Sequence, residues 1–418
     1  MNDFPLMIPV RQDFPKSAPL DIPATVRREL ARVPVKPGAR IAVAVGSRGI
    51  SNLAAVVAEV VRGLKSAGAQ PFIVPAMGSH GGATPEGQRG VLEGYGVTEA
   101  SMGVPIRASL EVEQVGATAD GVAANWGVEA LRSDGVVVIN RVKPHTDFGG
   151  PFGSGILKMI AIGLGKQAGA SACHRAAARL GYERVIRSVG LTLLKSVPVL
   201  CGVALVEDAH HQTARIGVLL KDEIEAREPE FLAEARRMMP RLPFDEVELL
   251  VIDRIGKDIS GAGMDPNVTG RPIYGYSAAL SDTPSTKPVC RRIAVLDLTP
   301  ATHGNAIGIG MADFTTSRVV RAFDPVSTYM NVLTALSLPT AKIPIHFETD
   351  REVLGHALAS LALPDPCKAR VVRIQDTLTL GTIEVSGAYA GDLKSLATLG
   401  PARPMAFDDR GMLAPIAR

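Results

Sequence analysis

From Arg40 onward, short apolar runs alternate with longer amphipathic stretches. Residues 40–45 are apolar after the first position, and residues 53–65 carry an Ala/Val/Leu face at helical spacing. This alternation is typical of βα units around a mainly parallel sheet. We therefore expect strands at residues 40–45, 70–75, 135–142 and 198–206.

Helices are expected between and after these strands. Residues 53–65, 171–180 and 224–239 have helical spacing, and Thr84 followed by Pro85 has the chemistry of a helix start. A second α/β segment begins near residue 243, with expected strands at 248–252, 292–298, 342–347 and 369–374 and helices at 325–336 and 351–361.

The pattern predicts an α/β protein with two α/β domains and mainly parallel sheets. We place the domains at residues 1–243 and 244–387. The tail 388–418 is expected to return to the first domain, and the active site is expected in the cleft between the two.

Composition limits the class of protein. Of 418 residues, 46% are hydrophobic and 21% are charged, which excludes general disorder. The net charge of +3 comes without runs of like charge, which favours neither nucleic acid nor a membrane surface and points to a small-molecule partner. Four scattered cysteines, no secretory signal and no 18-residue apolar window predict a soluble cytoplasmic protein.

Chemically active side chains follow three consecutive predicted strands. The first exit is GSRGISN with Arg48, the second is GSHGGAT with His80, and the third is KPHTDFGG with Lys143 and His145. Open parallel sheets bind ligands beyond the carboxyl ends of their strands. The flanking glycines allow backbone amides to approach an anion closely. We expect these side chains to share one rim.

The following block, PFGSGILKMIAIGLGKQAGASACHRAA, contains Lys158 and His174. Its GLGKQA segment fits a degenerate dinucleotide fingerprint, although Lys158 would interrupt the preceding strand. A phosphate-binding P-loop is excluded because Gln167 stands where Ser or Thr is required. Taken singly, Lys158 and His174 also suit structural roles, a snorkelling lysine and a packed histidine. Their convergence with the strand exits favours a functional role.

These motifs resemble the nickel-pincer-nucleotide lactate racemase family, a group of 2-hydroxyacid racemases and epimerases. The resemblance is carried by GSRGISN, GSHGGATPEG and the block VKPHTDFGGPFGSGILKMIAIGLGK…ACHRAA, and its most specific element is the order His145, Lys158, His174. It implies a cofactor, pyridinium-3,5-bisthiocarboxylic acid mononucleotide, held covalently by Lys158. It also implies that His174 coordinates nickel.

The resemblance implies further roles in the same rim. His80 and His145 would be the acid/base pair, because imidazoles that titrate near neutrality suit proton transfer for both enantiomers. Ser47, Arg48 and Lys143 would contact the cofactor, and Arg48 would also bind a substrate carboxylate. Imidazole and sulfur donors suit square-planar nickel. Cofactor-synthesis enzymes would be partners during maturation.

The sequence departs from the family in both halves. Val45 and Gly49 replace an acidic residue and a proline around Arg48, and the family's tyrosine, glutamine and lysine near the substrate are replaced in GKDISGAGMDPNVTGRP. We therefore expect a larger or more polar hydroxyacid than lactate, contacted by Asn267 or Arg271. The segment GNAIGIGMADFTTSR either faces the cleft or forms a strand–turn–helix with a Thr cap.

Other functions use the same residues. A metal-assisted lyase or hydratase of a hydroxyacid or sugar acid would need no pincer cofactor. A binding homologue without turnover would retain only the cleft. A nicotinamide-dependent dehydrogenase would use GLGKQA.

Overall fold

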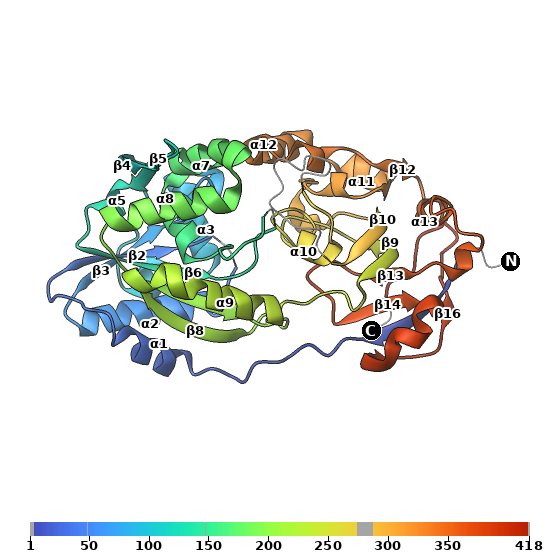
Figure 1. The fold of residues 1–418 in the computed structure, drawn as a ribbon, viewed down its shortest axis with the longest axis horizontal. Coiled ribbons are helices and arrows are strands. Elements are labelled where there is room, and N and C mark those ends of the chain that lie inside the picture. The colour runs from blue at the N-terminus through green and yellow to red at the C-terminus, as the bar shows by residue number, and fades with distance from the viewer. Residues whose placement is uncertain (1–3, 48, 147, 274–286, 417–418) are drawn as a thin grey trace. The chain divides into compact units, whose positions relative to one another are not determined.

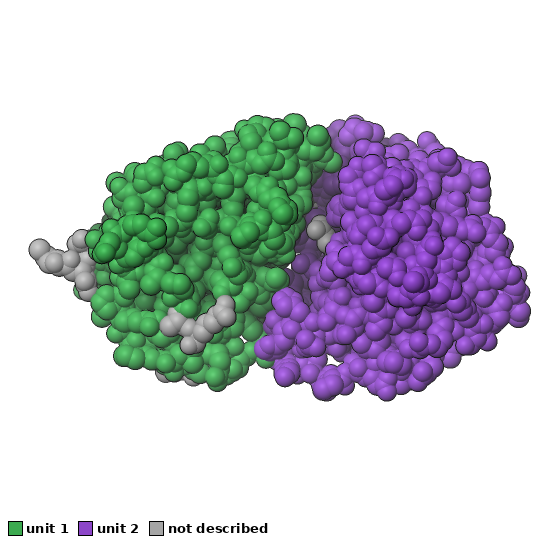
Figure 2. Space-filling model, turned by 180° about the vertical axis from the view of Figure 1, so that it is seen from behind, with its two compact units in different colours: residues 1–14, 240–418 green, residues 15–239 purple. Residues whose placement is uncertain are grey.

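The computed structural model describes residues 4–47, 49–146, 148–273 and 287–416. The chain divides into two compact units (Figure 2): unit 1 comprises residues 1–14 and 240–418, and unit 2 comprises residues 15–239. Both units are mixed α/β structures with large, mostly parallel sheets, which confirms the expected fold class (Figure 1).

The sheet of unit 2 has the order β3-β2-β6-β7-β8, in which β8 alone runs antiparallel to its described neighbour. Its central strands are almost wholly buried, as expected for a parallel sheet covered on both faces. The strands are β2 (Arg40–Val45), β3 (Gln70–Pro75), β6 (Gly135–Arg141), β7 (Val199–Glu207) and β8 (Thr213–Leu220), and a separate hairpin consists of β4 (Val112–Ala117) and β5 (Ala123–Gly127).

Helices and short helical turns connect these strands. They are α1 (Ile22–Leu30), α2 (Leu53–Ser66), η1 (Gly81–Ala83), α3 (Pro85–Gly94), α4 (Glu99–Met102), α5 (Val128–Leu131), α6 (Ile156–Lys158), η2 (Met159–Gly163), α7 (Lys166–Leu180), α8 (Tyr182–Ser196), η3 (Lys221–Glu223) and α9 (Ile224–Met238). Thr84 caps α3 as predicted, because its side chain accepts a hydrogen bond from the Gly87 amide at 3.0 Å.

The sheet of unit 1 has the order β12-β11-β10-β9-β13-β14-β1-β15, with β16 also paired to β1. Strands β12 through β13 run parallel, and the remainder pair antiparallel. The strands are β1 (Leu6–Arg11), β9 (Glu246–Ile252), β10 (Val289–Val295), β11 (Phe314–Thr316), β12 (Ile345–Phe347), β13 (Val371–Ile374), β14 (Thr382–Ser386), β15 (Ala397–Thr398) and β16 (Arg403–Pro404).

The helices of unit 1 pack on this sheet around a core of its own, which includes Leu249, Val251 and Val353. They are α10 (Pro266–Thr269), α11 (Ser317–Ala322), α12 (Pro325–Ala335) and α13 (Asp350–Ala359), with helical turns η5 (Pro300–Thr302), η6 (Ile309–Met311), η7 (Leu338–Ala341), η8 (Pro366–Lys368) and η9 (Gly387–Ser395). Within the described part of the chain, no helix is both long and apolar enough to cross a membrane.

The two chain ends differ from the expected domain division. Residues 1–14 and the tail 388–418 both belong to unit 1, whereas the sequence pattern assigned them to the first domain. The reason is sheet pairing: β1 lies between β14 and β15, with Met7 opposite Ser386 and Val10 opposite Thr398. Met7 and Val10 are buried there.

Candidate active site

The predicted rim residues of unit 2 follow neighbouring parallel strands. Ser47 comes after β2, His80 after β3, and Lys143 and His145 after β6. Because β2 lies between β3 and β6 and all three run parallel, these exits meet at one edge of the sheet. Arg48, predicted to bind cofactor and substrate, lies outside the described residues.

The loop that carries His80 is tied to its neighbours. The Ser47 hydroxyl and His80 Nδ1 form a hydrogen bond, and the Tyr95 hydroxyl donates to the Ser47 carbonyl at 2.8 Å. The fully buried Gln88 amide donates to the Gly78 carbonyl at 2.9 Å. The His80 imidazole is therefore exposed, while hydrogen bonds hold the backbone of its loop.

Lys158 and His145 are in direct contact. Lys158 is the last residue of α6, and its Nζ lies 2.5 Å from His145 Nε2. The His145 ring stacks on Phe148, with centroids 4.4 Å apart. Both members of the pair are half-buried, so each retains some access to solvent.

His174 lies on α7 and belongs to the same cluster. Its Nδ1 is 3.1 Å from the Tyr182 hydroxyl, and the Tyr182 ring stacks on Phe148 at 5.7 Å. Burial, and to a smaller degree the charge of Lys158, lowers the pKa of His174 to about 4. The imidazole is therefore neutral near pH 7, which is the form that binds metal ions.

Two residues of this cluster are missing from the sequence prediction. Phe148 and Tyr182 form an aromatic row that joins His145 to His174, and both are buried. The available signal was the scarcity of aromatic residues, 4% of the chain, together with the position of Phe148 three residues after His145. Nothing in the local pattern indicates that Tyr182 would face the same way.

The GLGKQA segment does not have the context of a dinucleotide fingerprint. It follows the helical segments α6 and η2, whereas that motif requires a preceding strand. A Cβ atom at Gly163 would lie 2.7 Å from the Ala76 carbonyl, so this glycine permits close packing against the β3 exit. Lys166 is buried, its Nζ donates to the Pro75 carbonyl at 2.5 Å, and burial lowers its pKa to about 8.

The predicted substrate contacts of unit 1 are engaged in local structure. The Asn267 amide donates to Asp265 at 2.8 Å. Arg271 pairs with Asp313 at 2.8 Å and donates to the carbonyls of Met311 at 3.0 Å and Cys290 at 3.1 Å. The guanidinium thus links three parts of unit 1.

Residues 304–318 contain the strand and the Thr-capped helix expected as one alternative for them. Residues Phe314–Thr316 form β11, and the Thr316 hydroxyl accepts a hydrogen bond from the Val319 amide at the start of α11. The segment is a strand–turn–helix with a Thr cap.

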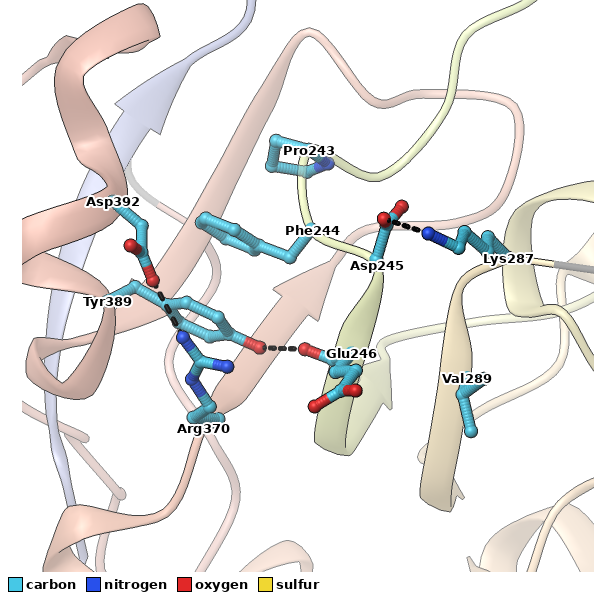
Figure 3. A pocket seen from close by; sticks show the side chains of 9 residues that line it. All are labelled: Pro243, Phe244, Asp245, Glu246, Lys287, Val289, Arg370, Tyr389 and Asp392. Atoms are coloured by element: carbon cyan, nitrogen blue, oxygen red, sulfur yellow. Dashed lines mark hydrogen bonds and ion pairs between the residues drawn. The ribbon is translucent and has the colours of Figure 1, made fainter.

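A pocket of about 520 Å³ on unit 1 lies where β9 and β10 begin (Figure 3). Phe244 stacks on Tyr389 in its wall, and the charged groups of Arg370 and Lys287 pair with Asp392 and Asp245. Ligands of parallel sheets bind at the opposite, carboxyl ends of the strands. We assign this pocket no role in catalysis.

Across the residues that the structure describes, no group of three or more His, Cys, Asp or Glu side chains is placed to hold a metal ion. No protein-family model matches the chain, and no curated protein matches it either.

Solved structures do resemble the chain. The lactate racemase apoprotein from Thermoanaerobacterium thermosaccharolyticum aligns over 90% of this chain and 99% of its own, with a TM-score of 0.52 and 16% identity. A protein from Thermotoga maritima aligns over 66% of this chain and 69% of its own, with a TM-score of 0.45 and 12% identity. The first likeness shows that this chain has a lactate-racemase-like fold.

Proposed function

We propose that this protein is a racemase or epimerase of a 2-hydroxyacid that works with a nickel-pincer nucleotide tethered to Lys158. The observation that carries the proposal is the cluster of His145, Lys158 and His174 at one edge of unit 2. The lactate-racemase-like fold adds support.

The residues fit such a cofactor. Lys158 presents a primary amine at the end of a helix, next to a histidine, and would form the covalent link to the pyridinium-3,5-bisthiocarboxylic acid mononucleotide. His174 is neutral, and the Tyr182 contact at Nδ1 leaves Nε2 as the nitrogen for nickel. Ser47, Arg48 and Lys143 would contact the nucleotide. When bound, this cofactor would supply the group that accepts a hydride from the α-carbon of the substrate and returns it.

The chain's own residues would move the hydroxyl proton. His80 and His145 stand on the exits of β3 and β6, on either side of the β2 exit, so each would serve one enantiomer. The Ser47 hydrogen bond orients the His80 ring. The Lys158 amine now contacts His145 Nε2. Once this amine is linked to the cofactor, the His145 imidazole would be available to the substrate.

Substrate recognition is proposed for Arg48, whose guanidinium would pair with the carboxylate of the 2-hydroxyacid. Asn267 is a second proposed contact. Arg271 is left out because Asp313 and two carbonyls engage its guanidinium. Cofactor-synthesis enzymes would load the protein, and the cytoplasm is the proposed compartment.

The experiment is maturation in a host that also expresses the cofactor-synthesis enzymes, followed by intact-protein mass spectrometry and nickel analysis. Wild type is expected to carry an adduct and nickel. Lys158→Ala should lose both, and His174→Ala should retain the adduct and lose nickel. Lys195→Ala, which alters an exposed lysine of α8, is the matched control and should resemble wild type. Neither adduct nor nickel on matured wild type would overturn the proposal.

A substrate deuterated at the α-carbon separates this reaction from the lyase or hydratase alternative. Hydride transfer should retain the deuterium through racemisation. A reaction through a carbanion should exchange it with solvent. Detectable turnover of any 2-hydroxyacid, lost in His80→Ala, would exclude a binding protein without activity.

A further inference from the structure

We propose that Glu228 is a positioning residue for Lys158, because its buried carboxyl group accepts a hydrogen bond from the backbone of α6, the helical turn that ends at Lys158. The consequence for catalysis rests on the proposed role of Lys158 as the tether. The contact itself belongs to the protein without any cofactor.

Glu228 reaches α6 from a distant helix. It lies on α9, is fully buried, and its Oε2 accepts a hydrogen bond from the Leu157 amide at 2.9 Å. The Ile156 amide, like that of Leu157, acts to lower the pKa of this carboxyl group against the effect of burial. These are the two residues immediately before Lys158, and Gly155 at the N-cap supplies no side-chain cap of its own.

A second buried side chain holds the same turn from the sheet. Asn140, near the end of β6, donates from Nδ2 to the Gly155 carbonyl at 3.1 Å. A Cβ atom at Gly155 would lie 2.0 Å from Glu228 Oε1, so only glycine admits the carboxylate here. Asn140 and Glu228 therefore hold successive peptide groups just ahead of the lysine.

An apolar side chain would fill this interior without the cost of burying a carboxylate, and burial raises the pKa of Glu228 to about 7. Glu228 Oε1 is buried without a hydrogen-bond partner among the described residues. What the carboxyl group provides is a hydrogen-bond acceptor for the Leu157 amide at the start of α6, and above its raised pKa this acceptor carries a negative charge.

The test uses the full chain without cofactor. Amide hydrogen exchange would be measured over residues 155–158, and Lys158 labelling by an amine-acetylating reagent would be followed by mass spectrometry. In Glu228→Ala, the Leu157 amide should exchange about tenfold faster, because its hydrogen bond to the buried carboxyl group is lost. The rate at which Lys158 is acetylated should differ several-fold from that in wild type, because α6 is held less firmly. The rate for Lys195 should stay the same.

Glu228→Gln tests the acceptor without the charge. Its carbonyl still accepts one amide, so both readouts should lie between those of wild type and Glu228→Ala, a partial rescue that loss of packing alone would not produce. Glu230→Ala, at an exposed site of α9, should match wild type. The proposal fails if Glu228→Ala folds with wild-type exchange and labelling. Should Glu228→Ala not fold, wild-type values in Glu228→Gln overturn it.

These outcomes are independent of the proposed function. A matured protein without adduct would overturn the cofactor proposal and leave the Glu228 contact standing. Unchanged exchange in the Glu228 variants would do the reverse.

Discussion

Tyr182 contacts both His174 and Phe148. Its hydroxyl lies 3.1 Å from His174 Nδ1, and its ring stacks on Phe148, which in turn stacks on His145. The hydroxyl determines which nitrogen of His174 is engaged within the protein, and the ring connects the proposed metal ligand to the proposed acid/base group. Partners of this kind commonly tune the metal affinity of a histidine.

Tyr182→Phe removes the hydroxyl and keeps the ring. We expect nickel retention by the matured protein to fall about tenfold or more, and stability to fall by about 1 kcal/mol. Competition with a chelator measures the first, and urea unfolding measures the second. Tyr329→Phe, on the exposed surface of α12, is the control. Unchanged nickel retention in Tyr182→Phe would contradict the role given to the hydroxyl.

Glu228 should make stability depend on pH. Burial raises its pKa from 4.5 to about 7, so between these values the folded protein holds a proton that the unfolded chain has released. Its contribution to the free energy of unfolding is therefore largest below pH 4.5 and falls by about 3 kcal/mol as the pH rises through 7. Urea unfolding across pH 4.5–8 should show this loss in wild type and not in Glu228→Gln. Parallel curves for the two proteins would refute the assignment.

At the scale of elements, η2 packs against the loop that follows β3. The Gly78 amide donates to the Gly163 carbonyl at 3.1 Å, and a Cβ at Gly163 would lie 2.7 Å from the Ala76 carbonyl. Gly163, one of the glycines that suggested a dinucleotide motif, thus brings a helical segment close to the loop of His80.

Two glycine substitutions should have opposite effects. Gly163→Ala forces η2 away from the β3 exit and should cost about 1–3 kcal/mol. Gly90→Ala, inside α3, meets no atom within 4 Å and should stabilise the protein by about 0.5–1 kcal/mol. Thermal unfolding of both variants provides the measurement, and a shift of the same sign in the two would refute the packing argument.

The elements with a clear hydrophobic pattern were predicted from the sequence. Strands β2 and β3 coincide with their expected bounds because both are apolar and buried. The run from α6 to α7 was only partly recognised, since its glycines are unfavourable in helices. Glu228 and the β3 exit hold that run in place, and both lie far away in sequence.

At the scale of the whole molecule, the first strand of the chain belongs to unit 1, which otherwise consists of residues 240–418. β1 joins the sheet of unit 1, while the residues that follow it build unit 2. Each unit contains its own hydrophobic core, one around Val43 and Val203 and the other around Leu249 and Val353.

Val10→Asp should therefore destabilise unit 1. A carboxylate at this fully buried position of β1 is expected to cost several kcal/mol and to speed amide exchange in its neighbour β14. Amides of β2 in unit 2 should exchange as in wild type. Leu6→Asp, at an exposed position of the same strand, is the control. Faster exchange confined to β2 would contradict the pairing.

The α/β class, the four parallel strands of unit 2 and the strand exits that carry His80, Lys143 and His145 follow from the sequence alone, because buried parallel strands and their glycine-rich exits are local patterns. The contacts between distant residues became known only from the folded chain: the aromatic row to His174, the Glu228 contact with Leu157, and the pairing of β1. These contacts join residues that are distant along the chain. Their partners are chosen by packing, which no local periodicity records.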